Sequence, residues 1–124
     1  MHPYQYLVLR CVPRVDRGES INVGVVLHAE AFQALLCGSH LDEARLAALA
    51  PDVDPGCVRD ALAVVADVCA GRGGPGRPVF ESLGQRFGWL AAPRSTVIQP
   101  GPVHGGMTAD AVTELELLLD RYVR

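Results

Sequence analysis

The pattern of apolar and polar positions changes its period part-way along the chain. Up to about residue 37, apolar side chains alternate with polar ones or form short runs, as in β-strands. From residue 42 onward they recur every three or four positions, which indicates amphipathic helices. This order predicts an α+β fold in a single domain, residues 1–124. We expect an antiparallel sheet of three to four strands, beginning as an N-terminal meander, with three to four helices packed mainly on one face.

The first two strands are predicted over Tyr4–Val12 and Ser20–His28, with a short charged connection between them. Pro13 ends the first strand because proline cannot donate a hydrogen bond within a sheet. A glycine inside the second strand, Gly24, indicates a bulge or a close approach by another group. Strict alternation along this strand would give one face to Ile21, Val23, Val25 and Leu27, and the other to Asn22, Gly24, Val26 and His28.

The same patterns predict further strands and helices. Strands are expected over Phe32–Cys37 and Ser95–Gln99, and helices over Asp42–Ala50, Pro55–Ala70, Phe80–Phe87 and from a cap at Thr108 to Tyr122. Segments 71–78 and 100–106 are rich in glycine and proline, so we expect irregular loops there. The last helix should bury one stripe, which consists of Val112, Leu115, Leu118, Leu119 and Tyr122.

Composition and charge exclude several classes of function. The formal net charge is −3, which argues against broad binding to nucleic acid or to an anionic membrane surface. All 11 basic residues are arginine, which excludes a Schiff-base lysine, a lysine general base and a Walker A phosphate loop. No apolar run is long enough to cross a membrane and no signal peptide is recognisable, so we expect a cytoplasmic location.

The cysteines and histidines do not indicate a metal site or a cofactor. None of the 4 cysteines forms a Cys-x-x-Cys pair, and each lies among apolar neighbours, so we expect free, buried thiols. No two histidines have the spacing of metal ligands on a helix. The two arginines of segment 71–78 could bind a phosphate, but the segment lacks a nucleotide-binding fingerprint, which favours a mobile connector. We therefore predict no cofactor and no metal.

The candidate chemistry is concentrated in the first hairpin, which contains Arg10, Glu19 and Asn22. Polar groups with directional hydrogen bonds are costly inside an apolar sheet, so each of the three needs a partner. In one interpretation Arg10 binds an anionic group while Glu19 and Asn22 orient it. In the other interpretation the three satisfy one another and lock the hairpin. The residues alone leave both interpretations open.

Four segments of the chain together resemble a known family. They are Tyr4–Pro13, Glu19–Leu27, Trp89–Ser95 and Pro102–Gly106, and they resemble the bacterial family catalogued as domain of unknown function 3037. The resemblance spans nearly the whole chain. It implies a small cytosolic bacterial protein whose gene often lies beside one for a kinase of the HipA type, and therefore a partner or regulator of such a kinase. It implies no established activity.

Two hypotheses of function follow. No nucleophile–base pair, metal set or cofactor fingerprint is present, which favours a non-catalytic interaction or regulatory module acting with a HipA-type kinase over an enzyme. The alternative is a small anion-binding protein or enzyme with its site around Arg10, Glu19, Asn22 and His104. A homodimer through an exposed sheet edge is compatible with either. The resemblance implies one candidate binding site, which consists of Arg10, Glu19, Asn22, Arg94, Ser95 and His104.

Overall fold

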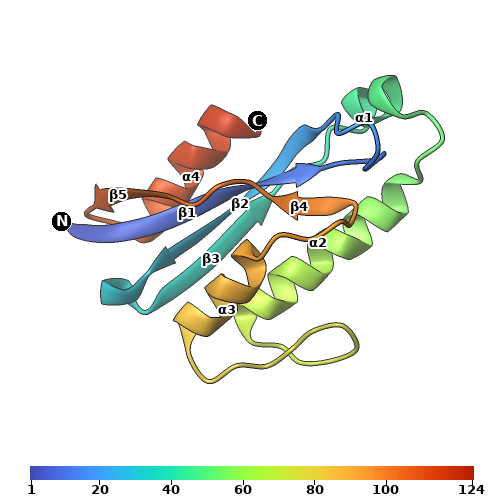
Figure 1. Ribbon diagram of the computed structural model, residues 1–124. Helices are drawn as coiled ribbons and strands as arrows, with labels where there is room; N and C mark the ends of the chain where they lie inside the picture. Colours follow the sequence, from blue (N-terminus) through green and yellow to red (C-terminus); the bar gives the residue numbers. More distant parts are fainter.

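One open antiparallel sheet organises the molecule. The computed structural model describes residues 1–124 and contains five strands and four α-helices (Figure 1). The strands are β1 (His2–Cys11), β2 (Ile21–Ala29), β3 (Ala34–Ser39), β4 (Ile98–Pro100) and β5 (His104–Thr108). The predicted α+β fold is confirmed, and the sheet has one strand more than the sequence pattern indicated.

The central strand of the sheet is β1. The strand order is β3-β2-β1-β4, and β5 pairs with the N-terminal half of β1 along the same edge as β4. A short 3₁₀ helix, Glu30–Phe32, connects β2 to β3, so the predicted N-terminal meander is present. Both β4 and β5 come from the C-terminal third of the chain, and they bring residues 98–108 beside the first strand.

Helices cover both faces of the sheet, three on one face and one on the other. They are α1 (Glu43–Leu49), α2 (Pro55–Ala70), α3 (Leu83–Ala91) and α4 (Ala111–Tyr122). Leu7 and Leu9 of β1 belong to the larger core, which α1, α2 and α3 complete. Val25 and Leu27 of β2 pack against α4 in a smaller core on the opposite face. In Figure 1, α2 and α3 lie on one side of the strands and α4 on the other.

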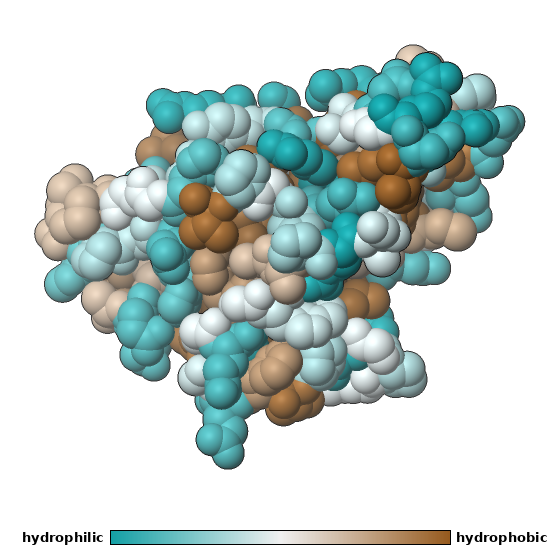
Figure 2. Space-filling view, viewed as in Figure 1, coloured by the Kyte–Doolittle hydropathy of each residue, from teal (hydrophilic) through white to brown (hydrophobic).

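The surface is consistent with this coverage. On the side of the molecule seen in Figure 2, apolar atoms form separate small areas among polar ones, because both sheet faces are covered by helices. No helix has the length and apolar character needed to cross a bilayer.

Side-chain caps determine where the helices begin. The prediction for α2 is confirmed at both ends: Asp54 accepts a hydrogen bond from the Gly56 amide, and Pro55 is the first helical residue. The prediction for α4 was wrong at its start, because Asp110 is the cap and Thr108 ends β5. One member of the predicted stripe was also wrong, since Val112 is 61% exposed. The residues that α4 buries are Ala111, Leu115, Leu118 and Leu119.

The segment expected to be an irregular loop, 100–106, contains the first residues of β5. Residues His104–Thr108 pair with His2–Tyr6 of β1, although two of the five are glycine. Glycine weakens an isolated strand, but here it permits a close approach. A Cβ atom on Gly106 would lie 2.8 Å from the hydroxyl of Tyr4, which covers it. Tertiary packing therefore decides the structure of this segment against its local propensity.

Candidate functional site

A β-bulge determines which hairpin side chains share a face of the sheet. Leu9 pairs with Gly24, but the next residue of β1, Arg10, pairs with Asn22. The strand β2 therefore has one extra residue, Val23, at this point. Residues directly opposite each other on antiparallel strands point to the same side. Arg10 and Asn22 consequently lie together on the face that α4 covers.

The bulge also overturns the strict alternation predicted for β2. Val23 packs in the core beneath α2 and α3, whereas Val25 packs beneath α4. Gly24, which indicated a bulge or a close approach, lies at this bulge and also lies close to the neighbouring strand β3. A Cβ atom on Gly24 would lie 2.8 Å from the carbonyl oxygen of Gly38 on β3. The residue is thus required to be small because a neighbouring backbone is so near.

Glu19 does not join the other two polar residues of the hairpin. It lies in the exposed connection between β1 and β2, where its carboxylate accepts a hydrogen bond from Arg17 and forms an ion pair with it. Arg10 makes no contact of this kind with Glu19. The interpretation in which Arg10, Glu19 and Asn22 satisfy one another is therefore wrong.

Asn22 has a structural partner far along the chain. Its side-chain Nδ2 donates a hydrogen bond of 3.1 Å to the main-chain oxygen of Tyr122, at the last turn of α4. The last carbonyl groups of a helix lack partners within the helix, so this contact satisfies one of them. The only asparagine of the chain thus fastens the end of α4 to the hairpin.

Arg10 remains without a partner in the protein. Its side chain is exposed and forms neither a hydrogen bond nor an ion pair. It lies between two strands, opposite Asn22 on β2 and Gln99 on β4. The guanidinium covers Gly101, where a Cβ atom would be 3.3 Å from Nη2 of Arg10. Its donors are therefore free for a group from outside.

Aromatic side chains continue the same face toward β5. The ring of His104 lies 5.3 Å from that of Tyr6, its partner across the strands, and the Tyr6 ring lies 6.0 Å from that of Tyr122. The Tyr6 and Tyr122 hydroxyls are 3.3 Å apart. This hydrogen bond, together with burial, raises the pKa of Tyr6 to about 12. His104 is exposed and lies on a strand, not in the irregular loop that its glycine and proline neighbours indicated.

We call the face formed by Tyr6, Arg10, Asn22, His104 and Tyr122 the Arg10 surface. Arg10 lies four positions after Tyr6 on β1, a distance of roughly 13 Å along a strand. His104 and Arg10 therefore share a face without converging on one point.

Arg94 and Ser95 lie on the opposite side of the sheet. Arg94 follows α3, and its guanidinium binds the main chain at the end of that helix. Nε donates to the main-chain oxygen of Ala92 at 3.2 Å, and Nη2 donates to that of Trp89. The guanidinium also lies 4.2 Å from the centre of the Trp89 ring. Ser95 is exposed and makes no side-chain hydrogen bond. The six candidate residues thus divide among three places, namely the Arg10 surface, the hairpin connection and the end of α3.

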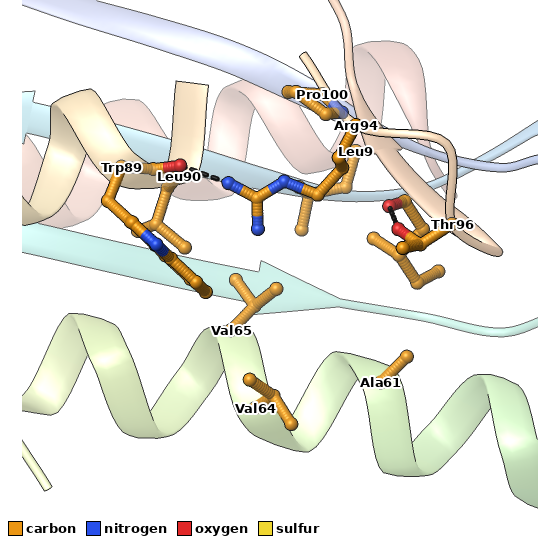
Figure 3. A pocket seen from close by; sticks show the side chains of 10 residues that line it. Leu9, Ala61, Val64, Val65, Trp89, Leu90, Arg94, Thr96 and Pro100 are labelled. Carbon is orange, nitrogen blue, oxygen red and sulfur yellow. Dashed lines mark hydrogen bonds between the residues drawn. The ribbon is translucent and has the colours of Figure 1, made fainter. Parts of the chain in front are cut away.

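A cavity of about 310 Å³ lies beside Arg94, between α2, α3 and β4 (Figure 3). Seven of its ten lining residues are hydrophobic. Leu9 of β1 and Ile98 of β4 contribute from the sheet, and Val64 and Val65 from α2. Thr96 lines it as well, but its hydroxyl already donates to the Ile98 carbonyl at 2.7 Å. Arg94 is therefore the one charged group of the cavity.

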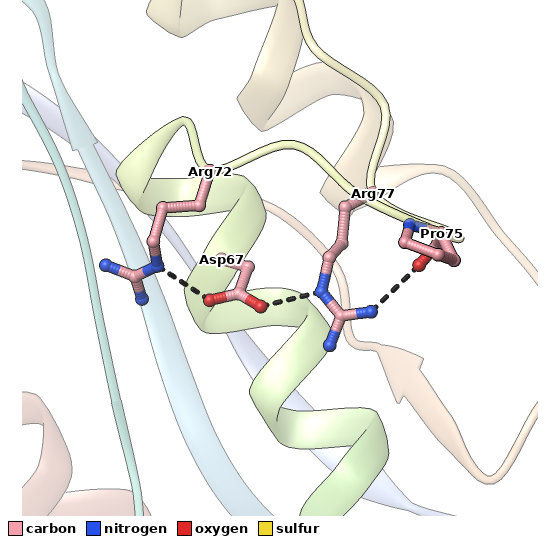
Figure 4. A network of polar contacts seen from close by, with 4 residues as sticks. All are labelled: Asp67, Arg72, Pro75 and Arg77. Carbon is pink, nitrogen blue, oxygen red and sulfur yellow. Dashed lines mark hydrogen bonds and ion pairs between the residues drawn. The ribbon is translucent and has the colours of Figure 1, made fainter.

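The glycine-rich segment 71–78 connects α2 to α3, and both of its arginines contact one carboxylate (Figure 4). Arg72 and Arg77 donate to the two oxygens of Asp67 on α2, at 2.8 and 2.6 Å. Arg77 also donates to the carbonyl oxygen of Pro75 at 2.8 Å. These pairs hold the pKa of Asp67 below its usual range. The arginines that a phosphate would need are thus engaged by the protein itself.

The cysteines are all free, but not all buried. Cys57 is exposed at the start of α2 and Cys37 is only partly buried, so the prediction of buried thiols was wrong for these two. Cys11 and Cys69 belong to the larger core as expected. No three His, Cys, Asp or Glu side chains are grouped in a way that could hold a metal ion.

Two functional features were missed from the sequence. Alternation along β1 already places Tyr6 on the same face as Arg10, and the structure agrees. The involvement of Tyr122 and the cavity beside Arg94 could not be found in this way, because both depend on which helix packs where.

The fold defines a small α+β protein with an open antiparallel sheet. The chain belongs to the family described as "Protein of unknown function (DUF3037)", whose model matches residues 6–123. The comparisons with curated proteins and with solved structures gave no match.

Proposed function

We propose that this protein acts by binding, as an interaction or regulatory module, and that the Arg10 surface contacts its partner. The observation that supports this proposal is the free guanidinium of Arg10. It is held at a defined place on a central strand, yet it has no hydrogen-bonding or ionic partner. A planar guanidinium pairs best with a carboxylate or phosphate, because it can donate two parallel hydrogen bonds.

The neighbours of Arg10 favour a protein as the partner. Tyr6, Tyr122 and His104 supply ring surface on the same face as the charge, and the contacts of Tyr6 with the other two rings keep them in place. Tyrosine and arginine are, with tryptophan, the residue types most enriched at the energetic centres of protein interfaces. We therefore expect an acidic side chain of the partner to reach Arg10 while a broader surface covers the rings.

We further propose that the partner is a kinase of the HipA type and that the complex works in the bacterial cytoplasm. The kinase is the partner that the family resemblance implies. The four free cysteines are compatible with a reducing compartment. In this proposal the protein regulates the kinase by contact and performs no chemistry of its own.

The test is recovery of the partner from the native host. We expect a tagged wild-type protein to retain the kinase, identified by mass spectrometry, and the Arg10→Gln variant to lose it. Arg45→Gln is the matched control, because Arg45 is exposed and forms no ion pair. All three proteins should unfold within about 0.5 kcal/mol of one another, since neither arginine has a partner to lose. Recovery of the wild-type protein without any kinase would contradict the proposal.

The alternative function, a small anion-binding protein or enzyme, would need Arg10, Glu19 and His104 around one pocket. Glu19 faces Arg17, and His104 lies beside Tyr6 farther along the sheet. This separation makes binding of a protein surface the better supported proposal. Calorimetric titration with inorganic phosphate distinguishes the two, because a dedicated anion site should bind it with an affinity that Arg10→Gln abolishes.

A second copy of the chain is a further partner that we propose to test. The sheet is open, and β3 forms one of its edges. Edge strands carry unpaired backbone groups that can join another sheet. Light scattering over a range of concentrations would show twice the monomer mass if two such edges pair, and the monomer mass throughout would contradict it.

A further inference from the structure

We propose that the cavity between α2, α3 and β4 binds a small amphipathic carboxylic acid, with its apolar part among the hydrophobic residues and its carboxylate on Arg94. The cavity lies across the sheet from the Arg10 surface, so this proposal is independent of the proposed function. It rests on the shape and lining of the cavity and on the orientation of one guanidinium.

The orientation of Arg94 is fixed by the backbone of α3. Nε and Nη2 donate to main-chain oxygens of Ala92 and Trp89, and the group stacks over the Trp89 ring. The remaining nitrogen, Nη1, has no hydrogen-bonding partner. Figure 3 shows it pointing into the cavity, toward Val65 on α2. The site therefore presents free donors in an apolar setting, already held in position for a ligand.

The setting makes a negative charge the fitting partner. Burial lowers the pKa of Arg94, because removal from water penalises the charged guanidinium. An anion placed against Nη1 would offset that penalty. The other polar residue, Thr96, has its hydroxyl occupied by the Ile98 carbonyl. The lining can therefore accept a ligand with one negative charge and one apolar part. Sugars, nucleotides and dianions with several polar groups are excluded.

The volume limits the size of the ligand. About 310 Å³ equals roughly ten water volumes, which suits a molecule of about ten non-hydrogen atoms. Ala61, Val64 and Thr96 are not fully buried, so the cavity reaches solvent between α2 and the segment before β4. Short aliphatic or single-ring carboxylic acids fit these limits, and long-chain fatty acids do not.

Trp89 provides a direct measurement, because it lines the cavity and is the only tryptophan of the chain. We expect hexanoate to change its fluorescence in a saturable way, with a dissociation constant on the order of a millimolar for so small a ligand. Hexanamide, which has the same apolar part without the charge, should bind at least about tenfold more weakly. Phenylacetate and phenylacetamide form a second pair with a ring in place of the chain.

Three variants assign the binding to the cavity. Arg94→Gln should weaken hexanoate by about tenfold and remove the preference over hexanamide. Arg45→Gln makes the same charge change at an exposed position that does not line the cavity, and should leave binding unchanged. Ala61→Leu should fill the cavity and block both probes while keeping Arg94, so the test stands even if Arg94→Gln does not fold.

Several outcomes would overturn the proposal. Equal binding of hexanoate and hexanamide would remove the role of the charge, and equal loss in Arg94→Gln and Arg45→Gln would indicate non-specific attraction. No fluorescence change with either acid would show that the cavity does not accept them. If Ala61→Leu instead changes the molecular mass measured by light scattering, a second copy of the chain occupies this place.

Discussion

The side-chain amide of Asn22 donates a hydrogen bond of 3.1 Å to the main-chain oxygen of Tyr122, across 100 positions of the chain. This contact joins the first hairpin to the end of the last helix. The donor is the side chain of the only asparagine in the chain. Arg10, which lies directly opposite Asn22, is left without a partner. The same pair of strands therefore contributes one residue to stability and another to recognition.

Removal of the Asn22 side chain should destabilise the fold. Asn22→Ala leaves a helix carbonyl without its partner in a half-buried place, which we expect to lower the free energy of unfolding by about 1 kcal/mol. Urea denaturation monitored by circular dichroism measures this change. Gln5→Ala, at an exposed position of β1, is the control and should change it by less than about 0.5 kcal/mol. Equal stability of both variants would contradict the role assigned to Asn22.

Two glycines should respond to alanine in opposite directions. Gly24→Ala places a Cβ atom 2.8 Å from the Gly38 carbonyl oxygen, so the two strands must separate, and we expect a loss of about 2 kcal/mol or more. Gly88 lies within α3 and has no atom within 4 Å of an added Cβ. Gly88→Ala should therefore stabilise by roughly 0.5–1 kcal/mol, because alanine favours the helix. Chemical denaturation of both variants tests the bulge geometry, which a stable Gly24→Ala protein would refute.

The Asp67 ion pairs should make stability depend on acid. The pKa of Asp67 is lowered by hydrogen bonds from Arg77 and Arg72, so the folded state favours the carboxylate. The stabilisation is complete above the unfolded pKa of roughly 3.9 and is lost as the pH falls through the lower folded pKa. Asp67→Asn should thus lower the melting temperature at neutral pH, and the difference from wild type should shrink below about pH 4.

Asp60 provides the control for this measurement. It lies exposed on the same helix and forms no ion pair, so Asp60→Asn should have the same melting temperature as the wild-type protein at neutral pH. A difference between Asp67→Asn and wild type that persists unchanged in strong acid would mean that packing, not charge, is lost.

The shared hydrogen bond of two tyrosines should be visible in alkaline titration. The pKa of Tyr6 is raised to about 12, chiefly by Tyr122, and its contribution to stability is present below pH ~10 and lost as the pH rises through about 12. Tyr122→Phe removes the partner hydroxyl, so the Tyr6 pKa should fall toward its ordinary value. Tyrosinate absorbance follows the titration. An unchanged Tyr6 pKa in this variant would show that burial alone causes the shift.

The predictability of the fold follows the range of the interactions concerned. Pro55–Ala70 was predicted with both ends correct, because an aspartate cap, a proline and a regular apolar stripe all act within the segment. β5 was not predicted, and residues 104–106 were expected to be irregular, because the pairing of β5 with β1 depends on residues a hundred positions away. The bulge was indicated by Gly24, but its consequence for Val25 required the register of two strands.

The candidate site divides in the same way. The sequence identified Arg10, Glu19 and Asn22 as side chains that need a partner, since planar polar groups are costly in apolar surroundings. Arg94 was added by the family resemblance alone. The sequence could not assign their partners, because hydrogen bonds and ion pairs act over a few ångströms and depend on the final packing of distant segments.

The sequence by itself determined the fold class, most of the helices and the family, because these depend on periodicity, caps and motifs carried in contiguous segments. Only the tertiary structure decided that Glu19 pairs with Arg17, that Asn22 donates a hydrogen bond to Tyr122, and that Arg10 has no partner. Only it placed Arg94 at a cavity. The physical reason is that a side chain's role is set by what the folded chain brings within contact of it.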